Sequence, residues 1–182
     1  MSRDFEAAWQ FTCTWEGGYV DNPEDPGGAT NHGITMATLQ HWRGPNVVVT
    51  KRDVQALGVD EAGAIARSLY WRPMDCGALP AGVGLLVFDF GFNAGPRQSV
   101  QEVQRWLGFT GADVDGVMGP QTELAIKGAH AVPLILGVSD AEVNFYRSLA
   151  TFPVFGQGWL DRVRARREQC LTMAQAAPAV TA

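Results

Sequence analysis

The amino-acid sequence predicts a mainly α-helical protein. Apolar residues recur three and four positions apart over much of the chain, and glycines, prolines and capping residues separate these stretches. A strand pattern is confined to a possible short hairpin within residues 17–34. With 182 residues, of which 46% are hydrophobic and 18% charged, the chain is long enough to fold around one core.

The first predicted helix begins at Phe5 and ends at the glycine pair Gly17-Gly18. Glu16 therefore lies in its last turn. Because residues three and four apart share a helix face, Glu16 projects on the same side as Trp9 and Cys13, toward the interior. Burial and the negative end of the helix dipole both disfavour the ionised carboxylate there. Glu16 is thus a candidate proton donor.

Residues 17–34 form a long loop-like segment that is rich in glycine, proline, asparagine and aspartate. Such loops in compact domains are more often functional than idle. The small loop or hairpin region that this segment predicts lies directly after the candidate acid.

The rest of the chain alternates helical patterns with turn signals. Thr35 is suited to cap one helix, and Thr50 with Asp53 resembles a capping box, as does Ser139 with Glu142. Beyond a short helix at the Thr50 cap, we expect helices over residues 36–42, 60–70, 83–93, 98–107, 120–127 and 139–149, and a last one from about residue 159. Residues 174–182 are alanine-rich and are expected to fray.

The charge of the chain argues against nucleic-acid binding. The formal net charge is -5, so no overall basic field exists to hold nucleic acid. The one basic concentration is interpreted as a solvated helix face without a catalytic role; it consists of Arg162, Arg164, Arg166 and Arg167.

The cysteines and histidines do not predict a metal site. The three cysteines lack a C-x-x-C spacing and are expected to be free thiols, and the histidines show no H-E-x-x-H pattern. We therefore expect no metal and no organic cofactor.

Glycoside hydrolysis is the chemistry that this arrangement favours, because it pairs one protonated carboxyl group with a second, ionised carboxylate. Asp21, Glu24 and Asp25 follow Glu16 in a polar stretch where a carboxylate can stay ionised. Asp25 is the preferred partner because the nine-residue interval gives the chain room to reverse. Tyr19 can stack on a sugar ring or donate a hydrogen bond to it.

A resemblance sharpens this prediction. The stretch from Trp15 to Thr35, with Glu16-Gly17-Gly18-Tyr19 and Asp25-Pro26-Gly27-Gly28, resembles the signature of glycoside hydrolase family 108, the bacterial and phage N-acetylmuramidases. The resemblance implies a lysozyme-like helical domain, and it implies that Glu16 is catalytic.

The spacing also resembles that of phage-type lysozymes, whose active site combines a glutamate, an aspartate and a threonine. Glu16 and Asp25 match it. Thr30 falls one residue short of the usual threonine position, which Asn31 occupies instead, so both are candidates for the cleft.

The second half resembles the peptidoglycan-binding segment that commonly follows this catalytic module. The matching stretches are residues 88–96, 103–108 and 114–122. The resemblance implies a catalytic segment over residues 1–87 and a helical peptidoglycan-binding segment over 88–175 packed on it. From the alanine-rich composition we expect a flexible tail over 176–182.

Two polar residues near the end of the predicted helix 83–93 need an explanation. Asp89 either faces the cleft or satisfies buried polar neighbours, as lone acids in apolar helices usually do. Asn93 is a candidate ligand for an N-acetyl group. The tryptophans that either line sugar subsites or belong to the core are Trp71, Trp106 and Trp159.

Together these observations predict hydrolysis of the β-1,4 bond between N-acetylmuramic acid and N-acetylglucosamine. The alternatives are a lytic transglycosylase and a non-catalytic cell-wall-binding module. The N-terminus lacks the pattern of a classical secretion signal, and no apolar run reaches membrane-spanning length. We therefore expect synthesis in the cytoplasm and release to the wall through a holin-like partner or a dedicated export route.

Overall fold

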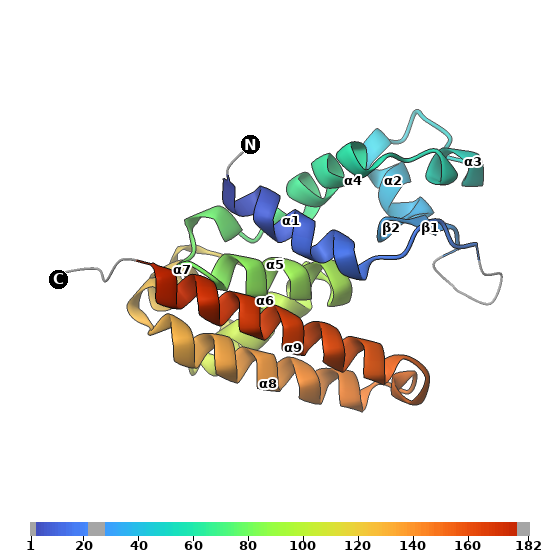
Figure 1. Ribbon diagram of the computed structural model, residues 1–182. Helices are drawn as coiled ribbons and strands as arrows, with labels where there is room; N and C mark the ends of the chain where they lie inside the picture. Colours follow the sequence, from blue (N-terminus) through green and yellow to red (C-terminus); the bar gives the residue numbers. More distant parts are fainter. Residues whose placement is uncertain (1–2, 22–27, 178–182) are drawn as a thin grey trace.

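The computed structural model describes residues 3–21 and 28–177, and Figure 1 shows a helical protein with one small hairpin. The N-terminal part contains α1 (Arg3–Trp15), β1 (Thr30–Asn31), β2 (Ile34–Thr35), α2 (Met36–Arg43), α3 (Lys51–Gln55) and α4 (Val59–Ala66), followed by the π-helical turn η1 (Arg67–Trp71) and the short 3-10 helix η2 (Cys76–Ala78). The C-terminal part contains α5 (Val83–Ala94), α6 (Pro96–Trp106), the 3-10 turn η3 (Gly111–Asp113), α7 (Pro120–Gly128), α8 (Ala131–Ser148) and α9 (Phe152–Ala176). The predicted fold class, mainly α with a small hairpin, is confirmed.

Helix α5 is the centre of the molecule. It is buried from Val83 to Phe92 and contacts α1 on one side and α6, α8 and α9 on the others. A helix whose buried residues are apolar except for Asp89 requires this position, because any exposed face would leave hydrophobic surface in water.

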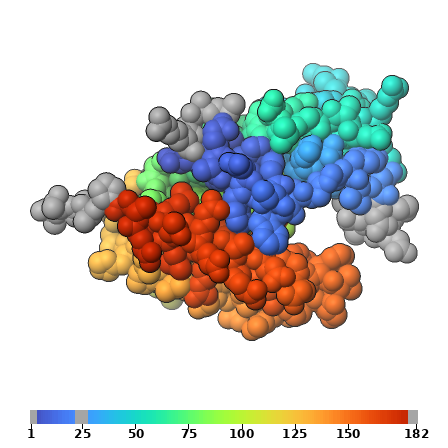
Figure 2. All heavy atoms as spheres, viewed as in Figure 1, coloured from blue at the N-terminus to red at the C-terminus, as the bar shows by residue number. Residues whose placement is uncertain are grey.

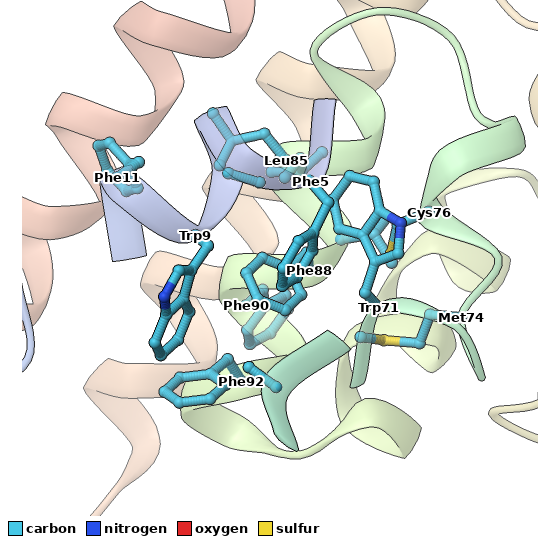
Figure 3. Close-up of a cluster of buried hydrophobic side chains, with 14 of the residues drawn as sticks. Phe5, Trp9, Phe11, Trp71, Met74, Cys76, Leu85, Phe88, Phe90 and Phe92 are labelled. Carbon is cyan, nitrogen blue, oxygen red and sulfur yellow. The ribbon is translucent and has the colours of Figure 1, made fainter. Parts of the chain in front are cut away.

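An aromatic cluster fixes α1 on α5. Figure 3 shows Phe5 of α1 beside Trp71 and Phe88, with edge-to-face contacts at centroid distances of 5.4–5.8 Å. Further along, Trp9 of α1 meets Phe92 of α5 at 5.8 Å. Each buried ring contributes on the order of 2 kcal/mol from the loss of apolar surface to water. The cluster therefore sets where the C-terminal end of α1 lies.

The hairpin turns over two residues. His32 (φ 50°) and Gly33 (φ 73°) both have positive φ, and Asn31 pairs with Ile34 across the turn. This is the left-handed turn that suits the twist of a two-residue hairpin. Ile34 is completely buried and anchors the hairpin to the core. The hairpin predicted within residues 17–34 is confirmed and extends by one residue, to Thr35.

The local capping signals gave mixed results. The cap at Thr35 and the capping box of Thr50 with Asp53 are both present. The capping box predicted at Ser139 and Glu142 is wrong, because α8 begins eight residues earlier and both side chains lie inside it. The Ser139 hydroxyl donates to a carbonyl four residues back, and Glu142 pairs with a buried arginine.

Two helices begin earlier in the chain than predicted. Helix α9 begins at Phe152 rather than near residue 159, and α6 begins at Pro96 rather than at 98. The predicted boundary between residues 87 and 88 falls inside α5, so the two predicted segments share one helix.

Within residues 3–21 and 28–177, no single helix has the length and hydropathy to cross a membrane. Helices α7 and α8 meet those criteria only as a pair bent by 117°.

Candidate active site

Glu16 directly follows the last residue of α1, where its backbone N–H still donates to the carbonyl of Thr12 at 3.2 Å. Its side chain is 17% exposed, so the carboxyl group is largely buried yet reachable from solvent. Figures 1 and 2 show this end of α1 between the α2–α4 lobe and the α8–α9 pair. The inward orientation predicted from helical spacing is confirmed.

The hairpin approaches the Glu16 carboxyl group through a glycine. A methyl group at Gly33 would lie 2.8 Å from Glu16 Oε2 and 2.5 Å from the Phe92 ring. Only glycine fits, since the position combines positive φ with contacts that exclude a side chain. The close approach of backbone occurs at Gly33, whereas additional methyl groups at Gly17 and Gly18 would meet open space.

Arg162 of α9 contacts Glu16 from the side of the α8–α9 pair. Its Nη1 donates to Glu16 Oε1 at 2.5 Å, across 146 residues of sequence. The interpretation of the basic concentration as a solvated face holds for Arg164, whose side chain is 69% exposed, but is wrong for Arg162 and Arg166, which are buried. The arginines fall on two faces of α9, and one of these faces is covered by α5 and α8.

Asp89 satisfies buried polar neighbours, as the second of the two interpretations predicted. It accepts hydrogen bonds from Thr12 at 2.8 Å, from Arg162 Nη2 at 2.7 Å and from Arg166 at 3.3 Å. Burial alone would raise the pKa of Asp89, but the two guanidinium groups and the threonine outweigh it and hold this pKa below its ordinary value. Asp89 is therefore ionised at the centre of the molecule.

Glu142 of α8 completes this set of charges. It accepts two hydrogen bonds from Arg166, one of them at 2.9 Å, and neither residue is accessible to solvent. Complete burial raises the pKa of Glu142 in spite of the paired guanidinium.

Among the described residues, Cys13 and Tyr70 also lie near Glu16, and both are neutral near neutral pH. Burial, together with the nearby Glu16 carboxylate, raises the pKa of the Cys13 thiol to about 11 and also raises that of the Tyr70 hydroxyl. The three cysteines of the chain are free, as predicted. Residues 3–21 and 28–177 contain no cluster of three side chains of the metal-binding kinds.

The candidate second carboxylates differ in what can be described. Glu24 and Asp25 lie outside the described residues. Asp21 is exposed and pairs with Lys51 of α3 at 2.9 Å. The backbones of Val20 and Thr30 exchange two hydrogen bonds of 2.8 Å, so the chain on both sides of residues 22–27 is tied to the hairpin.

The predicted substrate contacts lie in three different environments. Tyr19 is half-buried against the core, and the Thr30 hydroxyl is near the carbonyl of Gly28 at 3.4 Å. Asn31 is buried, and its amide nitrogen donates to three backbone carbonyls around the end of α3, at 3.1–3.3 Å. Asn31 thus connects the hairpin to α3. Asn93 is exposed at the end of α5, where its amide nitrogen donates to the Tyr146 hydroxyl at 2.9 Å.

In the segment that resembles a peptidoglycan-binding module, the turn at Asp115 and Gly116 is held against α6 by hydrogen bonds. Gln104 of α6 donates to Asp115 at 2.8 Å and accepts from the backbone of Gly116 at 2.9 Å. A side chain at Gly116 would collide with Arg97, so the loop can lie flat on α6. These contacts explain the aspartate–glycine pair without a ligand.

The fold and this site define a lysozyme-like glycoside hydrolase, and comparison with known proteins supports that class. The family described as Glycosyl hydrolase 108 matches residues 9–95. The structure entitled "Structure of Brucella abortus SagA" is similar to this chain with a TM-score of 0.86 and 39% sequence identity, and the match covers 95% of this chain and 97% of that one. No curated protein matches the chain.

The chain belongs to glycosyl hydrolase family 108. It is therefore a glycoside hydrolase, and its family implies a peptidoglycan substrate. Membership excludes the non-catalytic wall-binding module as the whole function of the chain.

Proposed function

We propose that this protein is an N-acetylmuramidase that hydrolyses the β-1,4 bond between N-acetylmuramic acid and N-acetylglucosamine, with Glu16 as general acid. The observation that carries the proposal is the position of Glu16. Its partly exposed carboxyl group lies between the α2–α4 lobe and the α8–α9 pair, and it faces the hairpin at Gly33, where only glycine fits. Its placement in the family signature agrees with this role.

The chemistry requires two carboxyl groups. Glu16 would donate its proton to the glycosidic oxygen as the bond to the anomeric carbon breaks, and a carboxylate would stabilise the oxocarbenium-like state or orient the attacking water. Asp25 is our choice for that carboxylate. The exchange of hydrogen bonds between Val20 and Thr30 supports it, because the chain flanking Asp25 is tied to the hairpin that contacts Glu16.

Three side chains are proposed to contact the glycan. Tyr19 can stack on a sugar ring, Thr30 lies on the strand that leads to the turn at Gly33, and Asn93 is exposed with its amide orientation fixed by Tyr146. Asn31 is not included, because its amide nitrogen is engaged by backbone carbonyls.

The direct test is Glu16→Gln, assayed by the release of soluble glycan fragments from purified sacculi. Loss of the proton donor should lower the rate by roughly 10²–10⁴-fold. Glu6→Gln is the matched control, since Glu6 is an exposed acid on the same helix. If Glu16→Gln digests sacculi within about twofold of the Glu6→Gln rate, a margin small against the general-acid contribution, the proposal is wrong.

A further inference from the structure

A cluster of buried charges joins Glu16 to the C-terminal helices. Within the described residues it contains three carboxyl groups and two guanidinium groups, which come from the end of α1 and from α5, α8 and α9. The members are Glu16, Asp89, Glu142, Arg162 and Arg166. Ion pairs this deep carry a large desolvation cost, and replacement by apolar residues is often neutral or stabilising. A role beyond stability would explain their presence.

The Arg162 guanidinium is held by one carboxylate and aimed at another. Its Nε and Nη2 donate to Asp89 at 3.2 and 2.7 Å, which fixes the plane of the group. The remaining Nη1 then points at Glu16. A planar five-donor fork can serve two carboxylates in this way, whereas a lysine ammonium is a point charge on a flexible stem.

Within residues 3–21 and 28–177, the cysteine and tyrosine side chains around the cluster are uncharged near neutral pH. Burial raises the pKa of the Cys170 thiol to about 12 and that of the Tyr146 hydroxyl further still. Cys13 and Tyr70, beside Glu16, are raised in the same direction. Among these described residues, the charge near Glu16 therefore comes from the carboxyl and guanidinium groups of the cluster.

Within this set the carboxyl groups exceed the guanidinium groups by one. With all five groups ionised the cluster carries a formal charge of minus one, and a single proton brings it to neutrality. The carboxyl side chains of Asp89 and Glu142 are 1% and 2% exposed, whereas that of Glu16 is 17% exposed. Glu16 is thus the member whose carboxyl group a substrate can reach.

We propose that Arg162, fixed by Asp89, is a positioning residue for the reaction: it holds the Glu16 carboxyl group in the orientation from which it donates its proton to the glycosidic oxygen. The proposal rests on the role of Glu16 as general acid. Arg162 lies on α9, outside the residues 9–95 that match the family, so the C-terminal half of the chain would complete the active site.

The test compares Arg162→Met with the parent protein on soluble, uncrosslinked glycan chains. Asp89 keeps Arg166 and Thr12 as partners in this variant, which favours folding. We expect kcat to fall by roughly 10–100-fold through misplacement of the acid, with KM changed by less than about threefold. Arg164→Met is the matched control, because Arg164 is exposed two residues away on the same helix.

The split between kcat and KM separates positioning from a merely structural effect. A misplaced acid should lower kcat and leave KM nearly unchanged in Arg162→Met, while Arg164→Met keeps the parental values of both. A folded Arg162→Met with the parent's kcat, or with a loss that lies mainly in KM, overturns the proposal.

Arg162→Lys provides a second reading that does not depend on the neutral variant folding. It keeps the cation and loses the fork, so kcat should stay about tenfold low although the charge beside Glu16 is retained. A parental kcat in Arg162→Lys would show that the fork is not needed. Glu16→Gln measured in parallel distinguishes the two failures: an active Glu16→Gln contradicts the proposed function itself, whereas an inactive one beside an unaffected Arg162→Met contradicts only this inference.

Discussion

The two fully buried acids of the charge cluster, one on α5 and one on α8, each have a guanidinium partner on α9. Asp89 lies between Arg162 and Arg166, and Glu142 pairs with Arg166 alone. Removing one member of such a pair leaves the other charge buried with less compensation, which costs more than the pair contributes.

Glu142→Gln is therefore expected to lower the free energy of unfolding by about 3–5 kcal/mol. Urea denaturation at neutral pH measures this value. Asp140→Asn is the control, because it removes the partner of Arg167 from an exposed pair worth less than about 1 kcal/mol. Equal stabilities of the two variants would contradict the account of the buried cluster.

At the scale of single residues, sequence spacing was a good guide where the neighbours are local. It placed Glu16 on the inward face of the first helix, because that face depends only on residues within two turns. It missed Arg162, because a helix face is recognised as buried only when its partner helices are known. The four-residue spacing of Arg162, Arg166 and Cys170, together with lone acids in apolar helices, was the available signal.

The hairpin is the element that faces Glu16 from the N-terminal lobe, and its turn depends on one glycine. Gly33→Ala would place a methyl group against Phe92 and against Glu16 Oε2. We expect a loss of more than about 2 kcal/mol in stability, from the strained φ and the collision together. We also expect at least a tenfold loss of activity, of the order that a displaced catalytic group produces.

Gly111→Ala is the matched control for the hairpin, since Gly111 also has positive φ (57°) but meets open space. It should show the backbone strain alone, about 1–2 kcal/mol in thermal or urea unfolding, with parental activity on sacculi. If both variants lose activity to the same extent, the contact between hairpin and Glu16 does not matter for the reaction.

Local rules predicted elements well where a cap is decided by a few neighbouring residues, as at Thr35 and at Thr50 with Asp53. The same kind of pattern misled at Ser139 and Glu142. There the serine and glutamate belong to the interior of α8, because Glu142 is needed as the partner of Arg166. A pattern four residues long cannot distinguish a cap from a tertiary ion pair.

At the scale of the whole molecule, α5 packs against α1 on one side and against α6, α8 and α9 on the others. It thereby brings the N-terminal and C-terminal parts of the chain together at Glu16. The mainly helical class followed from periodicity and turn signals, but the meeting of residues 146 positions apart did not, because no local pattern encodes which helices pack on α5. If Arg162 positions Glu16 as proposed, the activity depends on contacts between residues 9–95, which match the family, and the C-terminal helices beyond them.

The central claim, hydrolysis at the muramic acid side with Glu16 as acid, is tested most directly by the ends of the fragments released from purified sacculi. Mass spectrometry after borohydride reduction should show fragments that end in reduced N-acetylmuramic acid and that have gained one water per cleavage. Glu16→Gln should release few or none of them. Fragments that end in anhydro-muramic acid would instead show a lytic transglycosylase, and reduced N-acetylglucosamine ends would show cleavage of the other glycosidic bond; either result contradicts the account.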